Sequence, residues 1–187
     1  MSTGKLLALA ACVGLAACSR KEAGPAAAVK EGGGMAVYEE RERLFTCEVP
    51  AGWRVMEDQG GGQRVSFFGP PSGPKPYSSS IAFYYFPKAG SDYKSPQDYF
   101  SAQQASGSKT TPLEERSWKD RKVLEFTTKR RQPLMHAKKE FEDLAEETIL
   151  IPVKDGFVAV VHSASADAHD KTEPVFRSVL DTLRLRL

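Results

Sequence analysis

Two of the three histidines in this chain lie close to acidic residues near its C-terminal end. His162, Asp167, His169 and Asp170 fall within nine residues of sequence, and imidazole nitrogens together with carboxylate oxygens can hold Zn²⁺. The histidines do not adopt a tight ligand spacing, however, and no second pair of ligands is evident in the sequence. We therefore expect a solvated loop that leads into the last helix, and no metal site.

Cys47 is the only cysteine of the expected folded domain. A cysteine nucleophile needs a histidine near it in space, whereas the position of Cys47 between Phe45 and Val49 is typical of a small buried hydrophobic residue. The motifs of phosphate loops, dinucleotide sites, serine hydrolases and zinc peptidases are missing from the sequence. We expect no catalytic residues, no cofactor and no enzyme activity. The alternative hypothesis is a small hydrolase, or a ligand- or metal-binding protein, that uses Cys47 or the region of His162 and His169.

Five basic residues on either side of a predicted turn form a candidate interaction surface: Lys129, Arg130, Arg131, Lys138 and Lys139. Antiparallel pairing would bring the two groups together, and like charges at such a distance need water or an anionic partner around them. That partner would be lipid headgroups or an acidic protein, and a solvated hairpin is the alternative because acidic residues follow directly. Over 187 residues, Lys+Arg 26 against Asp+Glu 24 leaves a formal charge of only +2, so we expect no nucleic-acid binding.

The N-terminal segment has the size and composition of a signal peptide, which we place at residues 1–17. Lys5 precedes an unbroken run of apolar or small residues from Leu6 to Ala17. Twelve residues at about 1.5 Å each span about 18 Å, well short of the roughly 30 Å hydrocarbon core of a bilayer. The run therefore predicts a signal peptide rather than a membrane-spanning helix.

The run ends in Leu15-Ala16-Ala17-Cys18, which resembles the lipobox of bacterial lipoproteins. The resemblance implies that Cys18 is acylated, becomes the new N-terminus and anchors the protein in a membrane by its lipid chains. Ser19 resembles the pattern of lipoproteins that are passed on to the outer membrane. We therefore expect a lipid anchor in the outer membrane, facing the periplasm. The inner membrane is one alternative, and a plain secretory signal with an incidental Cys18 is another.

Residues 18–35 follow the signal peptide as a predicted flexible linker. They contain Gly, Ala, one Pro and mixed charges but no aromatic residue, so they cannot bury enough apolar surface to offset their ordering entropy. The folded domain is expected over residues 36–187, which is long enough for one substantial core.

Apolar patterns in this domain predict an α+β fold, an antiparallel β-sheet flanked by helices. Strands are expected over residues 44–49, 53–56, 64–68, 81–86, 114–118, 122–131, 140–153 and 157–161. Ser95 is the expected cap of a helix that reaches Ala105, and Thr172 that of the last helix. The apolar stripe that includes Phe176 should dock the last helix on the sheet, whereas Arg177 should contribute little to stability.

Several of these features together resemble the PsbP-type α/β/α sandwich. They are the segment Pro50-Ala51-Gly52-Trp53, the capped mid-chain helix, a late long hairpin that turns at a Gly, and the ending Ser178-Val179-Leu180-Asp181-Thr182-Leu183. That superfamily includes photosystem II extrinsic subunits, a Ran-GTPase-binding factor and many bacterial lipoproteins of unknown role. The resemblance implies a membrane-anchored periplasmic lipoprotein that serves as a non-enzymatic accessory or binding module for an envelope protein or component.

Overall fold

A computed structural model of the protein describes residues 34–58, 63–71, 78–133 and 141–187. The predicted signal peptide, Cys18 and the linker up to residue 33 lie outside the described residues, as do Lys138 and Lys139. The first strand begins at Met35, one residue before the predicted start of the domain.

The described residues form the following strands and helices, in chain order: β1 (Met35–Glu39), β2 (Phe45–Pro50), β3 (Arg54–Glu57), β4 (Gln63–Phe68), β5 (Ser79–Pro87), α1 (Pro96–Ala105), β6 (Lys109–Thr110), β7 (Glu114–Trp118), β8 (Arg121–Pro133), β9 (Phe141–Val153), β10 (Gly156–Ser165), α2 (His169–Thr182) and β11 (Arg184–Leu185). Every strand pairing among them is antiparallel.

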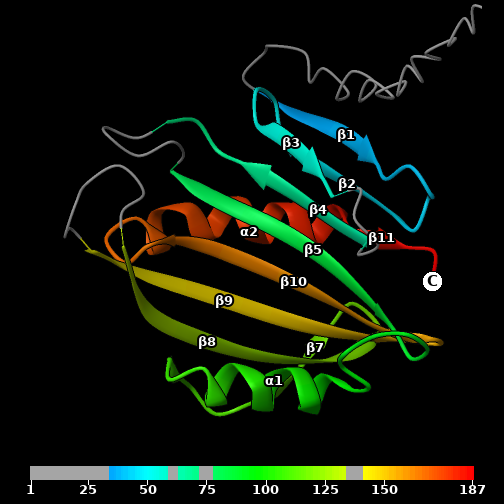
Figure 1. Ribbon diagram of the computed structural model, residues 1–187. Helices are drawn as coiled ribbons and strands as arrows, with labels where there is room; N and C mark the ends of the chain where they lie inside the picture. Colours follow the sequence, from blue (N-terminus) through cyan, green and yellow to red (C-terminus); the bar gives the residue numbers. More distant parts are fainter. Residues whose placement is uncertain (1–33, 59–62, 72–77, 134–140) are drawn as a thin grey trace, which may run out of the picture.

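The strands form one large sheet and one small sheet (Figure 1). The large sheet has the order β3-β4-β5-β10-β9-β8-β6, with β7 also paired to β8, and the small sheet has the order β1-β2-β11. Helix α2 contacts β10 and β5 on one face of the large sheet and β2 of the small sheet, while α1 contacts β9 and β6. The two helices lie on opposite faces of the large sheet (Figure 1), which confirms the predicted α+β fold.

Strand β10 lies inside the large sheet and is covered on both faces, as its near-continuous apolar sequence predicts. Val158 and Val160 belong to the core under α2, whereas Phe157 and Ala159 belong to the core under α1. The aromatic residues of β5 alternate in the same way. Phe83 packs in the core under α2, and Tyr84 and Phe86 pack against the core under α1. These aromatic residues therefore fill the two layers of the sandwich.

Helix α1 begins as predicted, because the Ser95 side chain accepts a hydrogen bond from the Asp98 backbone amide. Helix α2 differs from the prediction, since it begins at His169 and not after Thr172. The Thr172 hydroxyl donates back to the carbonyl oxygens of Ala168 and His169, at 3.1 and 3.2 Å, and so lies inside the first turns. The earlier start places His169 in the first turn of α2.

Candidate functional site

Glu147 of β9 and His162 of β10 are direct partners in the strand register, so their side chains lie on the same face of the sheet. Both residues are buried, with 4% and 0% of their surface exposed. Helix α2 crosses this face and brings His169 to the pair, and the ring centroids of His162 and His169 lie 4.7 Å apart. One ligand atom from each of the three residues lies within 4.8 Å of the others. We call these three residues the histidine–glutamate cluster.

This cluster is not the group of four residues, His162, Asp167, His169 and Asp170, that sequence spacing suggested. His162 and His169 do come together, but Asp167 is exposed and the Asp170 side chain is fully exposed. The carboxylate that joins the histidines is Glu147, which lies on the neighbouring strand. Glu147 is the one buried acidic residue of β9, in line with Ala145 and Ile149. Alternation along the strand places Asp143 on the same face, where it is exposed, so the sequence alone did not single out Glu147.

The hydrogen bonds of His162 determine which ring nitrogen carries its proton. Nε2 lies 2.9 Å from the Thr172 hydroxyl, whose own proton is donated to the backbone of the preceding turn. Thr172 therefore accepts from Nε2–H, and the lone pair of neutral His162 is on Nδ1. Nδ1 is buried and has no hydrogen-bond partner among the described residues. Burial lowers the pKa of His162 to about 4, with His169 and Arg177 adding to the effect, so the ring is neutral at pH 7.

His169 has a similar arrangement. Its Nδ1 lies 3.6 Å from Oδ1 of Asp170, and this negative charge favours the proton on Nδ1. Its Nε2 is buried and, within the described part of the chain, also has no hydrogen-bond partner. Two imidazole lone pairs are thus held next to a buried carboxylate, and no donor in the described part of the chain hydrogen-bonds to either of them.

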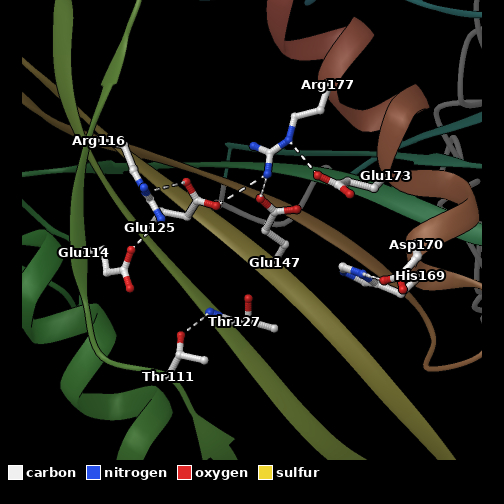
Figure 2. A network of polar contacts seen from close by, with 10 residues as sticks. All are labelled: Thr111, Glu114, Arg116, Glu125, Thr127, Glu147, His169, Asp170, Glu173 and Arg177. Carbon is white, nitrogen blue, oxygen red and sulfur yellow. Dashed lines mark hydrogen bonds and ion pairs between the residues drawn. The ribbon is translucent and has the colours of Figure 1, made fainter.

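Arg177 of α2 connects the cluster to a wider network of charges (Figure 2). Its guanidinium contacts Oε1 of Glu147 and also reaches Glu173 at 3.2 Å and Glu125 at 3.5 Å. Burial raises the pKa of Glu147 to about 7, and the nearby Glu125 adds to this, although the positive charge of Arg177 opposes it. Arg177 therefore links α2 to β8 through Glu125 and to β9 through Glu147, a role that the sequence did not indicate.

Three residues of the predicted basic surface, Lys129, Arg130 and Arg131, lie near the end of β8. Lys138 and Lys139 lie outside the described residues. In the described register, β8 pairs with an acidic stretch of β9, so Arg131 lies opposite Asp143. Arg130 makes two hydrogen bonds with the Glu146 carboxylate. The basic side chains of β8 are thus partly neutralised across the strands.

These basic residues still line an open groove of about 630 Å³. Its walls come from the end of α1, from β6, β8 and β9, and from the loop after β10, and they are formed by Ser106, Gly107, Ser108, Lys109, Lys129, Arg130, Arg131, Asp143, Leu144 and Ala166. Lys109 and Lys129 lie directly opposite each other in the register of β6 and β8. The groove therefore concentrates positive charge at one end of the sandwich.

Cys47 is buried in the core under α2, with 2% of its surface exposed. Burial raises the pKa of its thiol to about 12. No hydrogen bond between the described residues joins Cys47 to a histidine. The interpretation of Cys47 as a small buried hydrophobic residue is confirmed.

Comparison with solved structures identifies the fold. No family model matches the sequence, and no curated protein matches it. PsbP (CyanoP) of Synechocystis sp. PCC 6803 superposes with a TM-score of 0.54 at 13% identity, over 83% of this chain and 94% of that one. The Ran-binding protein Mog1p of Saccharomyces cerevisiae gives 0.53 at 9% identity, over 82% and 96%. This chain has the PsbP/Mog1 fold.

A third solved structure that superposes on this chain is PA94 of Pseudomonas aeruginosa, a protein of unknown function. It has a TM-score of 0.51 and 17% identity, and the match covers 83% of this chain and 99% of that one. These matches confirm the PsbP-type fold that the sequence resembles. Identities this low establish the fold alone, so the chemistry of the site depends on this chain's own residues. Within the described residues, no helix has the length and apolar character needed to cross a membrane.

Proposed function

We propose that this protein is a lipoprotein, anchored through Cys18 in the outer membrane, whose PsbP-type domain is a non-enzymatic accessory or binding module for an envelope protein. The observation that supports it most is a lipobox-like segment ahead of a domain whose fold also occurs in a protein named for binding another protein, Mog1p. A short lipid-anchored domain of this kind acts at the membrane surface by contact.

The groove lined by Lys109, Lys129, Arg130 and Arg131, which we call the basic groove, is the surface that fits a protein partner best. Arg131 lies over the ring of Phe141, with its guanidinium carbon 4.9 Å from the ring centroid. Phe141 is 53% exposed, although it is a large hydrophobic residue. Arginine and aromatic side chains are enriched at protein interfaces, where an apolar contact is surrounded by charged groups. The partner would present acidic side chains next to an apolar one.

Site-specific photo-crosslinking in intact cells tests this proposal. A photoreactive amino acid replaces Ala166, an exposed residue that lines the groove. The control replaces Lys122, which lies at the opposite end of β8 and pairs with Glu115. We expect one envelope protein to be captured repeatedly from position 166 and not from position 122, and the double variant Arg130→Ser, Arg131→Ser to reduce the yield.

Two results would count against the proposal. Equal capture from both positions, or no enriched protein from position 166, would exclude the groove as a protein-binding surface. If the protein without its lipid instead bound anionic vesicles at low salt and captured no protein, the groove would be a surface for lipid headgroups.

A further inference from the structure

We propose that Glu147, His162 and His169 form a binding site for a divalent transition-metal ion of the zinc type. Two imidazoles and one carboxylate are ligands that such ions prefer, and three protein ligands leave a further position open. The site is independent of the groove and of any partner. It belongs to the alternative function considered from sequence, with Glu147 in place of the aspartates.

The protonation states favour coordination. Nδ1 of His162 and Nε2 of His169 are both buried without a hydrogen-bond partner among the described residues. Leaving buried polar nitrogens unsatisfied is costly, and such groups in a native protein call for an explanation. A metal ion satisfies both lone pairs at once.

Second-sphere contacts already orient each ligand. Thr172 accepts the proton of the other His162 nitrogen, Asp170 lies beside the other His169 nitrogen, and Arg177 contacts one oxygen of Glu147. Histidines that bind metals regularly donate their second nitrogen to such a group, which sets both the tautomer and the ring orientation. The second oxygen of Glu147 lies on the side of His169 (Figure 2).

The surrounding charge suits a cation. Arg177 contacts the carboxylates of Glu125, Glu147 and Glu173, and Arg116 contacts Glu114 and also Glu125. With every carboxylate ionised, four negative groups face two guanidinium groups, a formal charge of −2. A divalent ion balances this charge next to Glu147, the one carboxylate of the four that is almost completely buried, with 5% of its side chain exposed.

Distance and access are also compatible with binding. Ligands that lie about 2.0–2.1 Å from a tetrahedral Zn²⁺ are about 3.3 Å apart. One possible ligand atom from each residue lies within 4.8 Å of the other two, so a pair at that distance has to close by about 1.5 Å. The His169 side chain is 13% exposed, which leaves an entry path at the first turn of α2.

The test uses the purified full-length chain without a polyhistidine tag, stripped of metal by a chelator. Zn²⁺ binding is measured by calorimetry, and Co²⁺ serves as a spectroscopic probe because its visible absorption is intense in four-coordinate sites. We expect one ion per chain, and a rise in the melting temperature of about 5–10 °C when free Zn²⁺ is 100-fold above Kd.

Variants locate the site. His169→Ala and Glu147→Gln should each remove the Co²⁺ bands, and Thr172→Val should weaken Zn²⁺ binding by about 10–100-fold because His162 loses its orienting partner. The matched controls are Asp167→Ala, which removes an exposed aspartate near the cluster in sequence, and His136→Ala, which removes the third histidine of the chain. Both controls should bind Zn²⁺ as tightly as the unmodified protein.

The metal-free melting temperature of each variant shows whether it folds, and His169→Ala is the main variant because His169 is less buried than His162. Absence of both the Co²⁺ bands and the Zn²⁺-dependent shift in the unmodified protein would overturn the proposal. Unchanged binding in folded His169→Ala, or loss of binding in His136→Ala, would overturn it as well.

Discussion

Arg177 and Glu147 form an ion pair that joins α2 to β9, and the carboxylate partner is almost completely buried, with 5% of its side chain exposed. A buried carboxylate that loses its positive partner keeps its desolvation cost without compensation. The pair is therefore a polar link between α2 and the sheet, next to the histidine–glutamate cluster and in addition to the apolar contacts of the helix.

Arg177→Ala should destabilise the fold by about 2 kcal/mol. This is less than the roughly 3–5 kcal/mol typical of breaking a fully buried pair, because the Arg177 side chain is 41% exposed. Urea unfolding of the metal-free protein measures the loss. The double variant Arg177→Ala, Glu147→Gln should be more stable than Arg177→Ala alone, and strictly additive losses would show that the two groups do not interact.

Phe176→Ala should be more damaging than Arg177→Ala. Phe176 is fully buried and stacks on the His162 ring, with the ring centroids 5.1 Å apart. Truncating a buried phenylalanine costs about 3–5 kcal/mol, because packing is lost and a cavity remains. Thermal unfolding followed by circular dichroism should show the larger drop in melting temperature for Phe176→Ala. A small shift would mean that α2 does not dock through this residue.

Gly156→Ala should destabilise the hairpin between β9 and β10. Gly156 has φ of +151°, and a Cβ built there would lie 2.0 Å from the Phe86 carbonyl oxygen. The matched control is Gly107→Ala, where φ is +80° and no atom lies within 4 Å of the added Cβ. Both variants carry backbone strain of about 1–2 kcal/mol, but only Gly156→Ala adds a clash. Equal losses in chemical denaturation would contradict this account.

Cys47 should be inert in the folded protein. Because burial raises the pKa of its thiol to about 12, almost no thiolate is present at pH 8. A thiol-alkylating reagent at pH 8 should modify Cys47 only after denaturant is added, as mass spectrometry of the peptide would show. Rapid alkylation under native conditions would instead indicate an accessible thiol and would reopen the nucleophile hypothesis.

Cys18→Ala should abolish lipidation and shift the protein out of the membrane fraction, since lipid chains provide the proposed anchorage. Metabolic labelling with a fatty-acid probe, followed by fractionation, measures both effects. Cys47→Ala is the control and should remain labelled and membrane-bound. Labelling that persists in Cys18→Ala would refute the lipobox assignment.

The elements that depend on local chemistry could be predicted from the order of the residues alone. The Ser95 cap, the turn at Gly156 and the inner strand β10 follow from capping, backbone freedom and apolar patterning, which act over a few residues. The last helix was predicted less well. Thr172 is a good cap by type, yet its hydroxyl bonds back to the preceding turn, and the helix begins at His169.

The histidine–glutamate cluster, in contrast, exists because of strand pairing and helix packing. Glu147 faces His162 because β9 and β10 pair in one particular register, and a shift by one residue would turn Glu147 to the other face of the sheet. His169 joins them because α2 packs across that face. Register and helix docking are settled by the burial of the whole core, so residues far apart in sequence meet for reasons that no local pattern contains.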